Sequence, residues 1–526
     1  MKRIQTNPSG SLVNLLLVLL VLLGIMSGAY FALRYSGWVI EVDSSRMSAI
    51  SEGIVATGGL RNYRPYRNGF GYGAMLAALN LITGIEIPVI QVGSGITIFM
   101  LLLVAFAAYR QILSGALSGL VATFLLLLQP DFLFYVVRAS HERVTWMFAL
   151  LMLFLLLRSQ QHAQAVKQLF IYIALFYLSF WTMVMSNVFF ASTFLLAISI
   201  GLAIGWIFER VAFRKNGNSY LPGVWMKRLL LISLSGFILI FLFIFYAYLP
   251  AKSYFYVFTS LADQMSLLFF GAEEVGSVAS YQYVGTAWRH QSTYLLLTGM
   301  QWIIAVSGLS VWVWSTLHLF RLNHKQRFLW QMYTSFGVLL AFGVIADFAG
   351  YLSSNLQLRL FTPFAMFSSA MVVMGMQVVW PKLTPPIKQW LVPAAGMLAI
   401  FAFVAAQAKI TNDPLFSNQW LFFTPAETRS HEWIDRHMEN RIIWVDTWDH
   451  LQQVFYFQEG YKVPVKNGYI HGARFFERQN VLLSDRVVLE SNRKGLILPS
   501  VVNDLKIYDN GSVRIFHPRP MTPYQR

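Results

Sequence analysis

The sequence contains no cysteine and few charged residues. Only 12% of its 526 residues are charged, whereas soluble domains average about 25%. The lack of cysteine excludes disulfides, thiolate nucleophiles and cysteine-ligated metal sites. Acidic residues are also scarce, 24 against 40 Lys and Arg, which gives a formal net charge of +16. In a soluble protein this excess would suggest nucleic acid. Here much of the positive charge lies between apolar segments, where it fixes membrane topology, so no nucleic-acid partner is expected.

Apolar residues dominate the chain instead. They make up 56% of it, and the mean hydropathy is +0.53. Runs of about 20 apolar residues, the length that spans a bilayer as a helix, recur from Leu12 to Ala408. A β-barrel would show short alternating segments. The sequence therefore predicts a polytopic α-helical membrane protein with about eleven transmembrane helices, resident in the cell membrane.

Basic clusters give the orientation of these helices. Lys and Arg concentrate in cytoplasmic loops, which places the N-terminus and four basic clusters inside: 158–167, 209–215, 321–327 and 382–388. The outer loops are then 35–88, 136–143 and 250–291. Within the first of them, residues 74–84 are expected to form a short helix on the membrane surface rather than a span.

The composition changes near Lys409. Residues 1–409 are read as the membrane domain and 410–526 as an extracytoplasmic α/β domain. Its expected elements are a helix in "PAETRSHEWIDRHM" and strands in "RIIWVD", "DRVVLES", "KGLILPS" and "SVRIFHP". "DNG" at 509–511 is a hairpin turn signal.

Charged residues that could carry chemistry gather on the outer side. They are Glu41 and Asp43; Arg138, His141, Glu142 and Arg143; Glu273, Glu274, Arg289 and His290; and Arg359. Taken singly, such residues at helix ends are more often solvated than functional. Together, carboxylates and an imidazole suit Mg²⁺ or Mn²⁺, and an arginine at the membrane rim can hold a phosphate. The pattern favours transfer from a lipid phosphate at the outer leaflet.

Four segments carry a resemblance to a known superfamily. They are "VDSSRMSAISEGIVATGGL" with the helix ending "LNLITG", "VVRASHERVTWMFALLMLFLLLRS", "NLQLRLFTPFAMFSSA", and the stretch from "TPAETRSHEW" through "TWDH". They resemble the outer loops, a late helix and the outer domain of GT-C membrane glycosyltransferases. These enzymes use polyprenyl-phosphate sugars, and oligosaccharyltransferase catalytic subunits are among them.

The resemblance implies a role for each matching residue. Asp43 takes the place of the essential acidic residue after helix 1, and His141 and Glu142 take the acidic-pair positions. Asp43 and Glu142 would be catalytic, and with His141 would bind a divalent cation. Arg359 would lie near the donor phosphate, and Arg138 would also contact substrate. Trp448 and Asp449 match two positions of the motif that reads the acceptor.

Two departures keep the reaction open. The acceptor-reading motif is incomplete, and "GSVASYQYVGTAW" lacks the catalytic glutamate that an oligosaccharyltransferase would have near Ser280. Transfer of a single sugar fits as well as transfer of a whole glycan, and the acceptor is a protein, lipid or glycan. The alternatives are a transporter or lipid-linked glycan flippase, and a family member with a degenerate site. A transporter predicts polar residues midway along several helices and often an internal repeat, and no repeat is visible.

Overall fold

The computed structural model describes thirteen segments of the chain. They are residues 10–34, 42–60, 66–161, 165–216, 223–252, 288–348, 356–411, 425–438, 442–446, 465–468, 480–485, 487–488 and 505–517. Within them, the side chain of Asp43 is not described.

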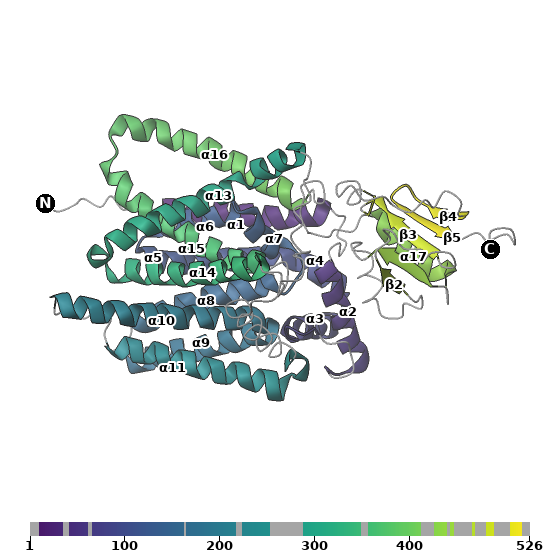
Figure 1. Ribbon diagram of the computed structural model, residues 1–526, viewed down its shortest axis with the longest axis horizontal. Coiled ribbons are helices and arrows are strands. Elements are labelled where there is room, and N and C mark those ends of the chain that lie inside the picture. Colours follow the sequence, from purple (N-terminus) through teal and green to yellow (C-terminus); the bar gives the residue numbers. More distant parts are fainter. Residues whose placement is uncertain are drawn as a thin grey trace, which may run out of the picture.

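Long helices make up the membrane part of the chain (Figure 1). They are α1 (Gly10–Arg34), α5 (Ile98–Leu113), α8 (Glu142–Gln161), α9 (Val166–Ser186), α10 (Val188–Asn216), α11 (Gly223–Leu242), α13 (Trp288–Leu317), α14 (His324–Phe348), α15 (Leu356–Val379) and α16 (Pro385–Thr411). In the described residues, nine helical segments are long and apolar enough to cross a membrane, or ten if one bent pair counts as a span. Helix α8 takes the place of the expected fourth span and packs between α5 and α9. The multi-pass helical fold predicted from the sequence is confirmed.

The apolar run 113–135, which the sequence predicts as one membrane span, is broken. Helix α6 (Ala116–Leu127) and helix α7 (Pro130–Val137) meet at 82°. Pro130 explains the break, because proline lacks the N–H of a helix interior and forces the preceding residue out of the helical region. Gln129 accordingly has extended angles, φ −101° and ψ 104°. The break turns α7 so that its end leads into the 138–141 loop.

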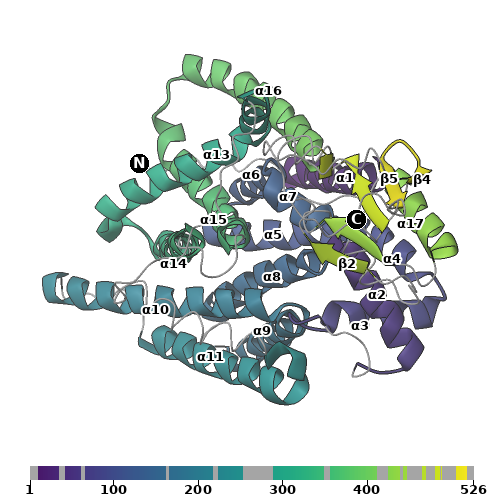
Figure 2. The same cartoon turned by 45° about the vertical axis from the view of Figure 1, so that its right-hand side comes forward.

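Three short helices lie at one end of the bundle: α2 (Val42–Thr57), α3 (Gly71–Thr83) and α4 (Ile87–Gly93). Their buried apolar residues include Met47, Tyr72 and Leu76, which pack together. Helix α3 has 13 residues and is too short to span, as expected for 74–84. In Figures 1 and 2 these helices lie on the side of the bundle that faces the C-terminal strands.

The C-terminal region contains helix α17 (Pro425–His437) and a five-stranded mixed sheet. The strands are β1 (Ile443–Asp446), β2 (Val465–Gly468), β3 (Asn480–Ser484), β4 (Leu505–Asp509) and β5 (Val513–His517), in the order β2-β1-β3-β5-β4. Strand β1 runs parallel to β2 and β3, whereas β5 is antiparallel to β3 and β4.

Four of the expected elements are present there. The helix in "PAETRSHEWIDRHM", the strands in "RIIWVD" and "SVRIFHP", and the hairpin at "DNG" all form, and Gly511 supplies the positive φ of 90° that the turn requires. The strand expected in "DRVVLES" is wrong, because the strand is the preceding "NVLLS", whose five residues are all buried. The strand expected in "KGLILPS" lies outside the described residues.

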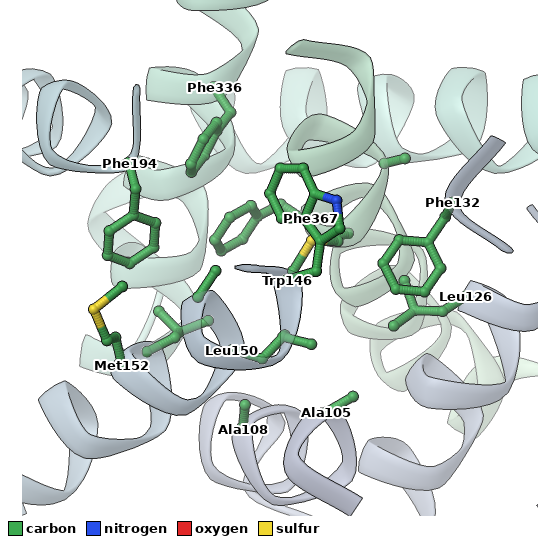
Figure 3. Packing of buried hydrophobic residues seen from close by; sticks show 14 of the residues in the cluster. Ala105, Ala108, Leu126, Phe132, Trp146, Leu150, Met152, Phe194, Phe336 and Phe367 are labelled. Carbon is green, nitrogen blue, oxygen red and sulfur yellow. The ribbon is translucent and has the colours of Figure 1, made fainter. Parts of the chain in front are cut away.

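Aromatic and small residues fill the bundle core (Figure 3). Phe336 of α14 stacks on Phe367 of α15 with ring centroids 5.0 Å apart, and Trp146 of α8 contacts Phe190 of α10 at 4.6 Å. Tyr109, 1% exposed, donates its hydroxyl to the backbone oxygen of Met366 (2.7 Å). These contacts hold α8 and α15, the helices that carry Glu142 and Arg359, in one packed unit.

Candidate active site

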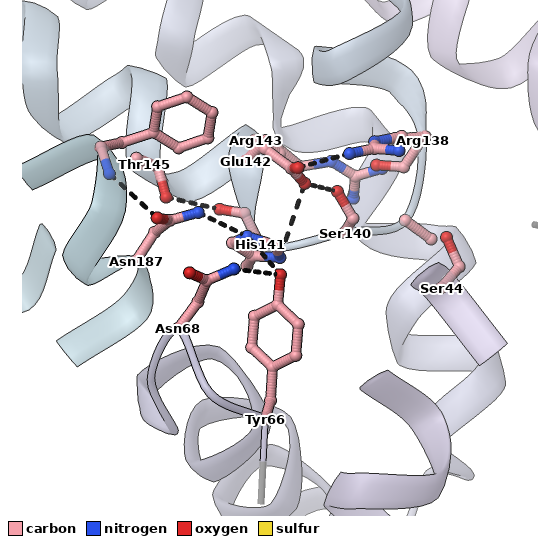
Figure 4. A network of polar contacts seen from close by, with 12 residues as sticks. Ser44, Tyr66, Asn68, Arg138, Ser140, His141, Glu142, Arg143, Thr145 and Asn187 are labelled. Carbon is pink, nitrogen blue, oxygen red and sulfur yellow. Dashed lines mark hydrogen bonds and ion pairs between the residues drawn. The ribbon is translucent and has the colours of Figure 1, made fainter. Parts of the chain in front are cut away.

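A buried polar cluster fills the loop between α7 and α8. Arg138, Ser140, His141 and Glu142 are all at most 6% exposed. Figure 4 shows their side chains converging, with Tyr66, Asn68 and Asn187 approaching from two other segments. Burial of so many polar groups is costly unless they are hydrogen-bonded, and each of these side chains makes at least one polar contact within the cluster.

Glu142 is the centre of this cluster. Its carboxylate accepts hydrogen bonds from the Arg138 guanidinium and the Ser140 hydroxyl. It stands at the first residue of α8, where the helix dipole favours negative charge. Burial raises the pKa of the Glu142 carboxyl, but Arg138 and Ser140 outweigh burial and hold that pKa below its ordinary value. Glu142 is therefore a carboxylate at neutral pH.

Arg138 is held from two sides. Besides its ion pair with Glu142, its guanidinium lies 5.1 Å from the ring centroid of Phe134 and 4.8 Å from that of Tyr135. Both rings belong to α7 and supply cation–π attraction. The helix that ends at Arg138 thus also fixes the direction of its side chain.

His141 is held in one tautomer by Asn187, which lies between α9 and α10. The Asn187 Oδ1 accepts the backbone N–H of Phe190 (3.0 Å), so its Nδ2 is the donor to His141 Nε2 (2.7 Å). An Nε2 that accepts a hydrogen bond carries no proton. The other ring nitrogen, Nδ1, faces Glu142 Oε2 at 3.5 Å.

A second segment, residues 66–69, lies against His141. The Tyr66 hydroxyl accepts from Asn68 Nδ2 (2.6 Å) and lies 3.4 Å from His141 Nε2. This segment is fixed by Gly69, whose φ is +149° and where a Cβ would lie 2.1 Å from the backbone oxygen of Met185. Only glycine fits this close approach.

Arg143, which also belongs to the predicted charged group, has a structural role. Its Nε donates to the backbone oxygen of Val136 (2.9 Å), and its Nη2 donates to those of Val137 (2.7 Å) and Arg138 (2.8 Å). These are the last carbonyls of α7, which have no partner within the helix. Arg143 thus caps the helix whose end positions Arg138.

Arg359 lies in the first turn of α15 and is exposed. Its guanidinium is 5.8 Å from the ring centroid of Phe189, at the start of α10.

The structure does not describe the side chains of the other predicted residues. Asp43 lies in the first turn of α2, but its side chain is not described. Trp448 and Asp449 lie outside the described residues, as do Glu41, Glu273 and Glu274.

The described side chains do not by themselves fit a metal ion. No group of three or more His, Asp or Glu side chains that could share a metal occurs among them. His141 Nε2 is bonded to Asn187, and Glu142 is bonded to Arg138 and Ser140. The predicted cation site would need Asp43 or carboxylates from the 250–291 loop.

Several residues of this cluster went unnoticed in the sequence: Tyr66, Asn68, Gln91 and Asn187. They are uncharged and come from segments distant in the chain. The signals available were an Asn at the junction of two apolar runs and a Gly-rich stretch at 69–73.

The cluster combines a carboxylate, an imidazole and a buried guanidinium at one end of an apolar bundle. An exposed arginine such as Arg359 can bind an anion.

Comparison with solved structures identifies the architecture. The oligosaccharyltransferase AglB of Archaeoglobus fulgidus, in complex with an inhibitory peptide and a dolichol-phosphate, aligns with 86% of this chain at TM-score 0.56 and 10% identity. Its apo form aligns with 90% at TM-score 0.57 and 11% identity, and its complex with Zn and sulfate aligns with 85% at TM-score 0.52 and 13% identity. The chain has the GT-C fold.

The match is one of fold and not of sequence. This chain covers 64% of the length of the first AglB structure, 70% of the second and 62% of the third. Searches against protein-family models and against curated protein sequences give no match. The GT-C fold places the α7–α8 loop and α2 at one end of the bundle, where the sequence predicted the site.

Proposed function

We propose that this chain is a membrane glycosyltransferase that moves a sugar or glycan from a polyprenyl-phosphate or -diphosphate donor to an acceptor on the extracytoplasmic side. The observation that carries the proposal is the buried Arg138–Glu142 cluster at the outer end of a GT-C fold. A neighbour with this fold, AglB, was determined with a dolichol-phosphate.

In the proposed reaction the acceptor nucleophile attacks the anomeric carbon. A new bond forms there while the bond from that carbon to the lipid phosphate oxygen breaks, with inversion. Asp43, with or without Glu142, takes the proton of the acceptor. The lipid phosphate leaves with the bonding electron pair, and Arg359 stabilises its charge. The exposed guanidinium of Arg359 can bind two phosphate oxygens at once.

Roles for the remaining predicted residues follow the same scheme. Arg138 keeps Glu142 ionised and adds positive charge near the donor. Trp448 and Asp449 would contact the acceptor. A divalent cation, Mg²⁺ or Mn²⁺, would neutralise charge on the leaving phosphate. Support for it comes from the AglB structure with Zn and sulfate. Because the described residues do not complete a metal site, no step above depends on it.

The test is transfer by the purified protein in lipid nanodiscs from a panel of radiolabelled polyprenyl-linked sugars, with and without Mn²⁺. We expect one donor to lose its label to an acceptor or to water, and Glu142→Gln to slow that loss. If no donor turns over while the protein carries intact lipid-linked sugar across a vesicle membrane, the chain is a transporter and the proposal fails.

A further inference from the structure

One buried amide joins the two segments that carry the proposed catalytic carboxylates. Gln91 of α4 is 0% exposed. Its Nε2 donates to the backbone oxygens of Ser44 (2.9 Å) and Ala139 (2.6 Å), and its Oε1 accepts from the Ser48 hydroxyl (3.0 Å). Both side-chain polar atoms of Gln91 are therefore bonded to other elements.

The partners of Gln91 stand next to the proposed catalytic residues. Ser44 follows Asp43 in the first turn of α2, and Ala139 follows Arg138 in the loop that precedes Glu142. The two partner residues are 47 and 48 positions from Gln91 in the chain, so no regular helix or strand bonding links these segments. In Figure 4, Ser44 lies beside this loop.

Glutamine suits this position for a chemical reason. The site presents two backbone carbonyls, which need donors, and one hydroxyl, which needs an acceptor. A glutamine amide supplies two N–H groups and one oxygen. A carboxylate of the same size lacks the donors, and a methionine lacks both. Either one would remove both hydrogen bonds that Gln91 Nε2 donates in this buried setting.

We propose that Gln91 is a positioning residue that sets the distance between α2, with Asp43, and the Arg138–Glu142 loop. It contacts no substrate. Its effect on the reaction is indirect, through the separation of the two carboxylates. The catalytic part of this inference rests on the proposed function, whereas the structural part does not.

The structural part is tested with a single thiol. The chain has no cysteine, so Ser44→Cys creates the only one, at a position that is 2% exposed. Its reaction rate with a soluble thiol reagent is measured alone and combined with Gln91→Met or Gln91→Glu. The matched control is Gln129→Met. Gln129 is also buried and donates to the Ser369 hydroxyl (2.7 Å) and to carbonyls, but it joins α15 instead of α2.

Release of the first turn of α2 is the expected result. We expect the thiol to react about ten times faster or more with Gln91→Met, since all three buried hydrogen bonds of the Gln91 side chain are lost. Gln91→Glu should act more strongly, and Gln129→Met should leave the rate unchanged. A rate with Gln91→Met within about twofold of that with Ser44→Cys alone would overturn the proposal, because the loss of three buried hydrogen bonds should exceed it. So would an equal increase with Gln129→Met.

Ser48→Ala provides a milder variant if Gln91→Met does not fold. It removes only the hydroxyl that donates to Gln91 Oε1, and we expect a smaller increase, about two- to fivefold for a single hydrogen bond. No increase would count against the proposal.

Turnover of the lipid donor tests the catalytic part. Gln91→Met should lower kcat about tenfold or more and leave the donor KM within about twofold, as expected when geometry rather than ground-state binding is lost. An unchanged kcat in a variant whose thiol is released would refute the positioning role. If the wild-type protein turns over no donor, the proposed function fails, and the thiol rates still decide whether Gln91 holds α2 to the loop.

Discussion

The Arg138–Glu142 pair makes a sharp prediction about stability. Both side chains are nearly buried, at 7% and 8% exposed. Removing one partner of a buried ion pair typically costs about 3–5 kcal/mol, because the other charge is left without compensation. We therefore expect Arg138→Met to cost about 4 kcal/mol of unfolding free energy.

Substitution of the other partner, Glu142→Gln, should cost less unfolding free energy than Arg138→Met. With Glu142→Gln, the guanidinium keeps its contacts with Phe134 and Tyr135, and cation–π contacts contribute about 0.5–2 kcal/mol each. The double variant buries no unpaired charge and should be more stable than Arg138→Met alone. Adding a second substitution would thus restore stability.

The assay is SDS-induced unfolding in lipid–detergent micelles, followed by tryptophan fluorescence. The control is Lys506→Met with Asp509→Asn, an ion pair whose side chains are 51% and 32% exposed. Lys506 lowers the pKa of Asp509, but water screens such a pair, and no coupling should be measurable. If the losses of Arg138→Met and Glu142→Gln simply add in the double variant, the two residues do not stabilise each other and the reasoning is wrong.

Three further predictions concern the helix cap, the topology and the donor. Arg143→Lys should lower the unfolding midpoint, because one ammonium cannot reach the three carbonyls at the end of α7 that the planar guanidinium satisfies; an unchanged midpoint would exclude the capping role. Cysteines at Ala56 and Asp435, both exposed, should react with an impermeant reagent in intact cells, and one at Lys388 only after permeabilisation. Labelling of only one of the cysteines at Ala56 and Asp435 would contradict the predicted topology. Arg359→Lys should raise the KM for the lipid donor, since it loses the fork that binds phosphate; an Arg359→Ala variant with unchanged KM and turnover would contradict this role.

The membrane part could be predicted from the sequence because its signal is local. An apolar run of about 20 residues predicts a span whatever it packs against. The break is also indicated locally, by Pro130, although the length of the apolar run 113–135 favours a single helix. In the C-terminal region, the valine pair Val487 and Val488 favours a strand in "DRVVLES". The actual strand is the preceding segment, "NVLLS".

The site could be predicted only where its residues are neighbours in sequence. Arg138, His141 and Glu142 belong to one short loop, so their meeting was foreseeable. Gln91 reaches that loop from α4 and Asn187 reaches it from the junction of α9 and α10, and nothing local in the sequence marks these contacts. The same limit applied to Arg143, whose charge suggested function although its partners are the backbone carbonyls of α7.

We propose that the carboxylate at the start of α2 acts in sugar transfer at the outer face. The decisive experiment measures the turnover rate of the lipid-linked donor at saturation for Asp43→Asn and for Glu52→Gln, an exposed carboxylate on the same helix. Asp43→Asn should lower the rate by about 10²–10⁴-fold, the contribution of a general base, while Glu52→Gln should stay near wild type. A rate for Asp43→Asn within a few-fold of wild type, in a protein that unfolds at the wild-type midpoint, would contradict it.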